Sequence, residues 1–162
     1  MTKFTCELSN ATGTELLILL KNNGISSSLS GNQSIWLNPD LPTGVIHVEV
    51  KPGQLDLSCG LNAMFLEEEQ KYFDISQIEG AMLCIENGLP TDLHVLVEHT
   101  GITTNLTPGD HVIVDPDVSW NQLLVQMESS DHIGIWGGID ATFVIDGEKS
   151  YTDDRVNKKA KA

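Results

Sequence analysis

The sequence predicts an all-β protein, a tandem pseudo-twofold repeat of two antiparallel units of about 75 residues with about six strands each, folded as a β-sandwich or a barrel-like structure. Two observations lead to this prediction. Residues 87–117 repeat residues 10–40 at an offset of 77 without a gap, and nine of these 31 positions are identical. Short apolar runs also recur between clusters of Gly, Pro, Asn and Asp, which is typical of short strands joined by turns.

The repeat divides the chain into residues 1–78, residues 79–148 and a flexible basic tail at residues 149–162. One extra residue after Asp117 is expected to change the offset to 78, which aligns Gly60 with Gly138 and Phe65 with Phe143. The identical positions are Asn10/Asn87, Thr14/Thr91, Leu16/Leu93, Leu19/Leu96, Gly24/Gly101, Ile25/Ile102, Leu29/Leu106, Pro39/Pro116 and Asp40/Asp117. Turn residues and aliphatic residues dominate this set, which indicates a shared scaffold.

Strands are expected where an alternating or continuous apolar run is bounded by turn residues. Residues 14–21 are mostly apolar, and the β-branched residues of the counterpart at 93–99 favour a strand over a helix. Prolines at positions 39 and 116 lack an amide donor and should end the preceding strands. The expected strands are residues 3–8, 14–21, 35–37, 45–50, 54–58 and 61–66, with short polar β segments after Gly24 and Gly101, and in the second repeat residues 93–99, 112–114, 122–128, 132–136 and 139–145.

Two expectations concern how these strands pack. Residues 54–58 and 61–66 are closely linked and are expected to form a hairpin, as are their counterparts in the second repeat. Trp36 and Trp136 alternate with aliphatic residues and are expected in the core. The linker at 67–79 is expected to hold at most a short helix.

Charge is the strongest feature of the composition. The formal net charge is −14, and residues 72–148 contain 13 acidic side chains and no Lys or Arg. Phosphate contacts need a basic face, so the sequence excludes nucleic-acid binding by the body of the protein. Two explanations of the acidity stay open: a solubilising surface, or attraction to a cation or a basic partner.

The amino terminus and the cysteines indicate the compartment. No apolar stretch follows Lys3 as in a signal peptide, so the protein is expected to be cytoplasmic as synthesised, with release without a Sec signal left open. Cys6, Cys59 and Cys84 do not correspond across the repeat. They are therefore expected to be buried thiols in a reducing compartment.

The matched loops Asn38-Pro39-Asp40 and Asp115-Pro116-Asp117 are rich in oxygen ligands. With Asp110 nearby, they suggest a calcium site formed by Asp40, Asp110, Asp115 and Asp117, because calcium takes six to eight oxygen ligands. The alternative is ordinary turn chemistry, since Asx-Pro sequences start turns. Calcium is the only cofactor that the sequence suggests.

Three further residues are candidates for binding. Trp120 lies in an expected loop, where an aromatic side chain often recognises a sugar, a lipid headgroup or a protein. His94 and His111 replace Leu17 and Ser34 of the first repeat. The sequence has no nucleophile elbow, phosphate loop, Cys-x-x-Cys or His-Glu-x-x-His, so it predicts no catalytic residues and no enzyme.

The opening segment, Phe4-Thr-Cys-Glu-Leu-Ser-Asn10-Ala-Thr-Gly13-x-x-Leu16, resembles the strand, turn and strand that begin some small bacterial insecticidal and aegerolysin-like proteins. This resemblance implies a leaderless, toxin-like β protein that binds a membrane or a receptor. The acidic body would be repelled by anionic lipid.

Taken together, these features predict a non-enzymatic acidic binding protein that recognises a protein partner, expected to be basic, through loops of the second repeat. The alternatives are the toxin-like protein and a calcium-dependent carbohydrate binder of a cell-surface ligand. Contact with membranes is left open, as is self-association through exposed sheet edges.

Overall fold

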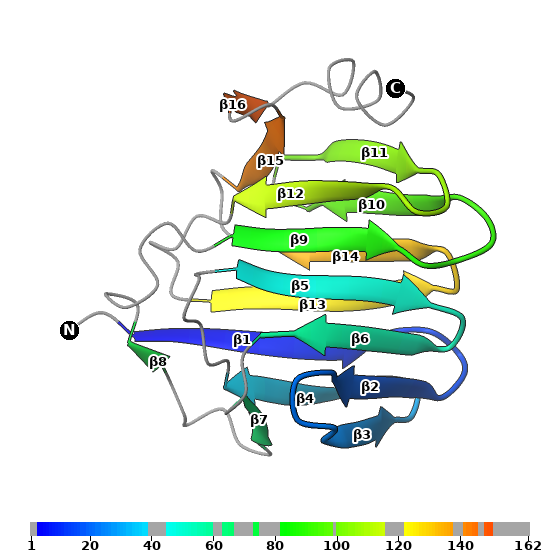
Figure 1. The fold of residues 1–162 in the computed structure, drawn as a ribbon, viewed down its shortest axis with the longest axis vertical. Helices are drawn as coiled ribbons and strands as arrows, with labels where there is room; N and C mark the ends of the chain where they lie inside the picture. Colours follow the sequence, from blue (N-terminus) through cyan, green and yellow to red (C-terminus); the bar gives the residue numbers. More distant parts are fainter. Residues whose placement is uncertain are drawn as a thin grey trace.

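The fold consists of two stacked β-sheets (Figure 1). The computed structural model describes residues 3–38, 45–59, 63–66, 73–74, 82–98, 100–115, 122–137, 141–145 and 148–150. None of these residues is helical, so no described segment could cross a membrane as a helix. The all-β, sandwich-like class expected from the sequence is confirmed.

The strands are β1 (Lys3–Asn10), β2 (Leu16–Leu20), β3 (Ser26–Leu29), β4 (Gln33–Asn38), β5 (Val45–Lys51), β6 (Gln54–Ser58), β7 (Met64–Leu66), β8 (Phe73–Asp74), β9 (Met82–Asn87), β10 (Leu93–Val97), β11 (Ile102–Leu106), β12 (His111–Asp115), β13 (Gln122–Ser129), β14 (His132–Trp136), β15 (Thr142–Ile145) and β16 (Glu148–Ser150).

Each sheet has eight strands. The back sheet has the order β11-β10-β14-β13-β1-β4-β7, and β8 pairs with β1 beside this path. The front sheet has the order β16-β15-β12-β9-β5-β6-β2-β3 (Figure 1). The expectation of about six strands per repeat is wrong, because each half of the chain contributes eight described strands, four to each sheet.

The sheets are mixed, which corrects the expected antiparallel units. Strand pairs β1–β13, β5–β9, β2–β6 and β10–β14 are parallel. Parallel neighbours cannot be joined by a tight turn and need a longer connection. Here the connection is made by changing sheets: between β2 and β6, both in the front sheet, the chain passes through β4 of the back sheet.

Two parallel pairs join the halves of the chain at the middle of the sheets. In the back sheet, β1 pairs with β13 and Cys6 lies opposite Leu123. In the front sheet, β5 pairs with β9 and Ile46 lies opposite Leu83. At the repeat offset of 77, Cys6 corresponds to Leu83 and Ile46 corresponds to Leu123. The two junction pairs are therefore formed by corresponding positions of the sequence repeat.

The expected hairpin of residues 54–58 and 61–66 does not form. β6 pairs with β5 and β2 in the front sheet, whereas β7 pairs with β4 in the back sheet. The same holds in the second half, where β14 pairs with β13 and β10 while β15 pairs with β12. A short connection therefore takes the chain from one layer to the other.

The extra residue of the second repeat lies later than expected. Val50 pairs with Leu55 and Met127 with Ile133, so the offset is still 77 in β13 and becomes 78 only in β14. A shift of register between Met127 and Ser129, near the end of β13, marks the place. A β-bulge holds one extra residue in one strand of a pair, so the rest of β13 keeps its buried face.

Alternate side chains of each strand fill the space between the sheets. In β10, Leu93, Val95 and Val97 are buried, whereas His94 and Leu96 are half-buried on the outer face. The same alternation corrects the expectation for two tryptophans. Trp36 and Trp136 are half-buried on the outer face of the back sheet, because the neighbouring apolar residues point inward.

Candidate functional site

Two carboxyl groups meet on the outer face of the back sheet, above a glycine. Glu128 lies in β13, Glu98 follows β10, and Gly134 lies in β14 between these strands. A methyl group placed on Gly134 would lie 2.6 Å from Glu128 Oε1, 3.1 Å from Glu98 Oε1 and 3.0 Å from Trp136 Cζ3. The missing side chain of Gly134 is therefore what allows the carboxyls and the indole edge to converge.

The carboxyl pair has unusual acid–base properties. Burial of Glu98, its hydrogen bond with Glu128 and the negative charge of Glu128 together raise the pKa of Glu98 to about 7. Two carboxyls at hydrogen-bond distance cannot both be ionised without strong repulsion, so they share one proton. Near neutral pH, the pair can release this proton or accept a cation in its place.

The first repeat has a different arrangement at the same positions. Lys21 and Lys51 stand where Glu98 and Glu128 stand in the second repeat, and Asp56 stands where Gly134 stands. There Lys51 Nζ lies 2.6 Å from Asp56 Oδ2. Burial tends to raise the pKa of Asp56, but hydrogen bonds from Lys51 and Gln54 outweigh it and hold that pKa below its ordinary value.

This first-repeat network is neutralised internally. Lys21 Nζ lies 3.9 Å and Lys51 Nζ 4.0 Å from Glu49 Oε1, so both lysines have acidic neighbours on the outer face of the front sheet. The second repeat has no lysine or arginine for such ion pairs, because residues 72–148 contain neither. Within its own repeat, only histidine could provide Glu98 and Glu128 with a positive charge.

The histidines beside the pair have their own partners. His94 of β10 and His132 of β14 lie opposite one another, with ring centroids 4.9 Å apart. His94 Nδ1 lies 2.7 Å from Asn105 Oδ1, and His132 Nδ1 lies 2.8 Å from Asp131 Oδ1. The hydrogen bond with His132 lowers the pKa of Asp131.

Of the four residues that the sequence suggested for calcium, the structure describes Asp110 and Asp115. Asp110 precedes β12 and accepts a hydrogen bond from Thr107, whereas Asp115 ends β12 and lies opposite Thr142. The two aspartates are thus at opposite ends of one strand. Asp40 and Asp117 lie outside the described residues, and within the described part no group of three or more His, Cys, Asp or Glu could hold a metal ion. The calcium site stays a prediction.

The suggested binding residues are also dispersed. His94 lies on the outer face of the back sheet, beside the carboxyl pair, whereas His111 is exposed on the front sheet opposite Glu86. Trp120 and most of the tail fall outside the described residues, although Lys149 and Ser150 belong to β16. Of the linker at 67–79, where a short helix was allowed for, only Phe73–Asp74 is described, and it forms strand β8.

The cysteines agree with the sequence prediction in part. Cys6 and Cys59 are buried, and Cys84 is half-buried. Burial raises the pKa of both Cys6 and Cys84, so neither thiol is activated as a nucleophile.

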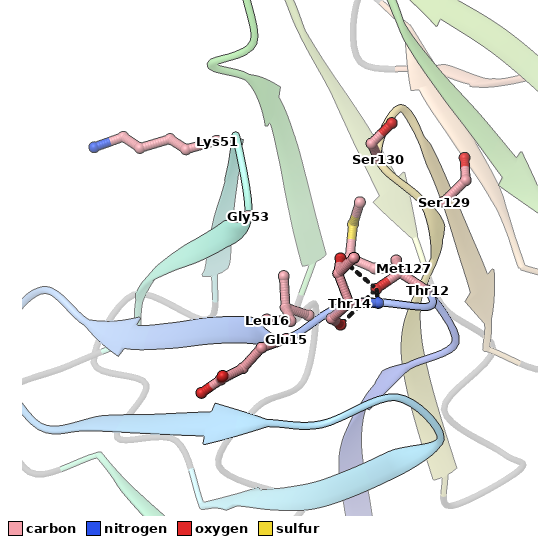
Figure 2. A pocket seen from close by; sticks show the side chains of 9 residues that line it. All are labelled: Thr12, Thr14, Glu15, Leu16, Lys51, Gly53, Met127, Ser129 and Ser130. Carbon is pink, nitrogen blue, oxygen red and sulfur yellow. Dashed lines mark hydrogen bonds between the residues drawn. The ribbon is translucent and has the colours of Figure 1, made fainter.

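A small cavity lies at one end of the sandwich, where loops of both repeats meet. It has a volume of about 50 Å³ and is lined by Thr12, Thr14, Glu15, Leu16, Lys51, Gly53, Met127, Ser129 and Ser130. Figure 2 shows the Lys51 and Glu15 side chains directed away from the two threonines. In the second repeat, Leu89 stands where Thr12 stands in the first, and its side chain is buried. The cavity thus accompanies the exchange of a leucine for a threonine, and the two charged side chains of its lining, Glu15 and Lys51, are directed away from the threonines.

The carboxyl pair is not among the sites predicted from the sequence, although the sequence contains an indication of it. Both lysines of the first-repeat network become glutamates at the corresponding positions of the second repeat. Two such exchanges are informative only when the sheet order shows that the residues are neighbours.

Comparisons with protein-family models, curated proteins and solved structures give no match for this chain.

Proposed function

We propose that the protein is a non-enzymatic acidic binding protein that recognises a basic side chain of a protein partner. The observation that carries this proposal is the carboxyl pair of Glu98 and Glu128, which converges over Gly134 without a lysine or arginine from its own repeat. The contact surface is the outer face of the back sheet and not only the loops of the second repeat.

The first repeat supplies an internal precedent for the interaction. Lys51, at the position of Glu128, forms an ion pair with the buried Asp56. A cation therefore fits at this place in the sheet when a carboxylate is available. In the second repeat, the cation would come from the partner and would take the place of the proton shared by the two glutamates.

We propose as well that the halves of the chain are pseudo-twofold copies of one unit. Corresponding junction pairs in the two sheets support this proposal. Loop hydrogen bonds support it too: Ala11 N donates to Met127 O and Gly88 N to Val50 O, each at 2.8 Å. A duplicated scaffold would leave one copy free to acquire acidic residues while the other kept its ion pairs.

The binding proposal is tested by calorimetric titration with deca-arginine at pH 7.5. Binding is expected to weaken steeply between about 50 and about 500 mM salt, because exposed charges are screened over shorter distances at high salt. The double variant Glu98→Gln/Glu128→Gln is expected to lose about tenfold or more in affinity, since its carboxyl pair is gone.

The matched control removes two charges elsewhere. Glu15 and Asp92 occupy corresponding exposed positions, so at pH 7.5 Glu15→Gln/Asp92→Asn removes at least as much negative charge and leaves the pair intact. This control should bind like the unmodified protein. An equal loss in both double variants would reject recognition by the pair and leave only general attraction.

A further inference from the structure

We infer that the partner presents an extended segment with two arginines four residues apart, laid across both repeats on the outer face of the back sheet. This inference rests on the proposed function and adds a second contact to it. The first arginine would bind at Glu98 beside Trp136, and the second at Glu7 beside Trp36.

A row of side chains runs across five adjacent strands on the outer face of the back sheet. Glu7 of β1 lies opposite Trp36 of β4 on one side and opposite Leu124 of β13 on the other. Leu124 lies opposite Trp136 of β14. Glu98 continues the row from β10, because its backbone N donates to Ile135 O, next to Trp136, at 2.9 Å. The row therefore has an acid and an indole at each end.

Charge selects this face over the front sheet. The described side chains on the outer face of the back sheet include Glu7, Glu98 and Glu128, and the only Lys or Arg on a described strand of this sheet is Lys3, at the start of β1. The front sheet instead pairs its acids with its own cations, as in Lys51–Asp56 and the 3.1 Å contact of His47 Nε2 with Glu86 Oε1. A basic partner would gain more from the face whose carboxylates lack such partners.

Aromatic neighbours favour arginine over lysine. The planar guanidinium group can pair with a carboxylate while it stacks on an indole, whereas an ammonium group acts as a compact point charge. Trp36 and Trp136 are both half-buried, so part of each indole remains accessible to a ligand.

Strand geometry sets the distance between the two arginines. The backbones of Glu7 and Glu98 are on β1 and β10, which are three strand spacings apart, or about 14 Å. An extended chain advances about 3.3 Å per residue, so residues four apart are separated by about 13 Å and point to the same side. A spacing of two is too short for the row, and a spacing of six is too long.

The test uses synthetic peptides of equal length and charge with two arginines spaced by two, four or six residues, and a peptide with one arginine. Calorimetry is expected to show the tightest binding at a spacing of four, by about tenfold over the other spacings. Glu7→Gln should reduce the affinity of the spacing-four peptide to that of the single-arginine peptide and leave the latter unchanged. Glu15→Gln is the matched control and should change neither.

The outcomes separate this inference from the proposed function. Equal affinity for all spacings, or no effect of Glu7→Gln, would overturn the two-point contact while binding that depends on Glu98 and Glu128 would stand. Failure of every arginine peptide would reject both. Binding of neutral oligosaccharides that is lost in Trp136→Ala, together with no binding of the peptides, would show that this face binds a glycan. The inference would then be wrong.

Discussion

Asn10 and Asn87 are buried at corresponding positions of the repeat and hold their loops with the same hydrogen bonds. Asn10 Nδ2 donates to Thr14 O at 2.8 Å and to Leu29 O at 2.9 Å. Asn87 Nδ2 donates to Thr91 O at 2.9 Å and to Leu106 O at 2.8 Å. Each asparagine ties the turn after its strand to a third strand in the other sheet, which explains why this residue is identical in both repeats.

Removal of either asparagine should destabilise the protein strongly. Asn87 also accepts a hydrogen bond from Leu89 N, so Asn87→Ala leaves three backbone groups without their partner. We expect a loss of about 3 kcal/mol in the free energy of unfolding, at roughly 1 kcal/mol for each group. Denaturant titration measures this loss, and Asn105→Ala, at an exposed position, should cost much less. A comparable cost at both positions would contradict the argument.

Stability should depend on pH through Glu98. Its pKa rises from 4.5 to about 7 on folding, so between these values the folded protein retains a proton that the unfolded chain has released. Raising the pH through this window therefore destabilises the fold, by about 1–2 kcal/mol after solvent screening is considered. Relative to the unmodified protein, Glu98→Gln should become more stable between pH 5 and pH 8. A constant difference in unfolding free energy would show that Glu98 does not titrate in this way.

Glu128→Lys should transfer the first-repeat arrangement to the second repeat. The new lysine would stand as Lys51 does and would form an ion pair with Glu98, replacing a shared proton by an opposite charge. We expect a higher melting temperature at pH 8, by about 1 kcal/mol in stability, together with loss of arginine binding. Asp92→Lys makes the same change of charge at an exposed turn and should have neither effect.

Thr12→Leu should fill the cavity at the end of the sandwich. The second repeat already has a leucine at this position, and Leu89 N still donates to Asn87 Oδ1 at 2.8 Å. A leucine here would bury apolar surface beside Leu16 and Met127, so a stabilisation of up to about 1 kcal/mol is expected in thermal unfolding. Destabilisation would indicate that the hydrogen bond from Thr12 Oγ1 to Asn10 Oδ1 matters more than the filled space.

Gly101→Ala should be costly although there is room for a methyl group. No heavy atom lies within 4 Å of the added Cβ, but the φ angle of Gly101 is 72°, where residues with a side chain are strained. We expect a loss of about 1 kcal/mol in stability, measured by denaturant titration. Gly13 is equally open and has no positive φ, so Gly13→Ala should have little effect.

The sequence predicts the class of fold and most strand positions because turn residues and alternation are local signals. It does not predict the partners of the strands, since alternation identifies the buried face but not the sheet to which it belongs. This is why β6 and β7 were expected to pair although they lie in different sheets. The sequence could have predicted the outward position of Trp36, because side chains alternate along a strand and the neighbouring Ile35 and Leu37 are apolar and point inward.

The candidate site required the sheet order. Glu98, Glu128 and Gly134 are separated by other residues in the sequence, and only the pairing of β10, β14 and β13 brings them together. Charge composition alone could predict an acidic second repeat, and with it a basic partner, but not the face or the residues concerned.

The parallel junctions determine when the chain can complete its fold during synthesis. The back sheet needs β1 beside β13, so the pair Cys6–Leu123 joins positions that are far apart in the sequence. As the nascent polypeptide leaves the ribosome, β5 can acquire its neighbour β9 first, whereas β1 keeps an open edge until β13 has emerged. Such distant pairing slows folding because the loop must close before its contacts can form. The first half thus exposes a strand edge until β13 has emerged.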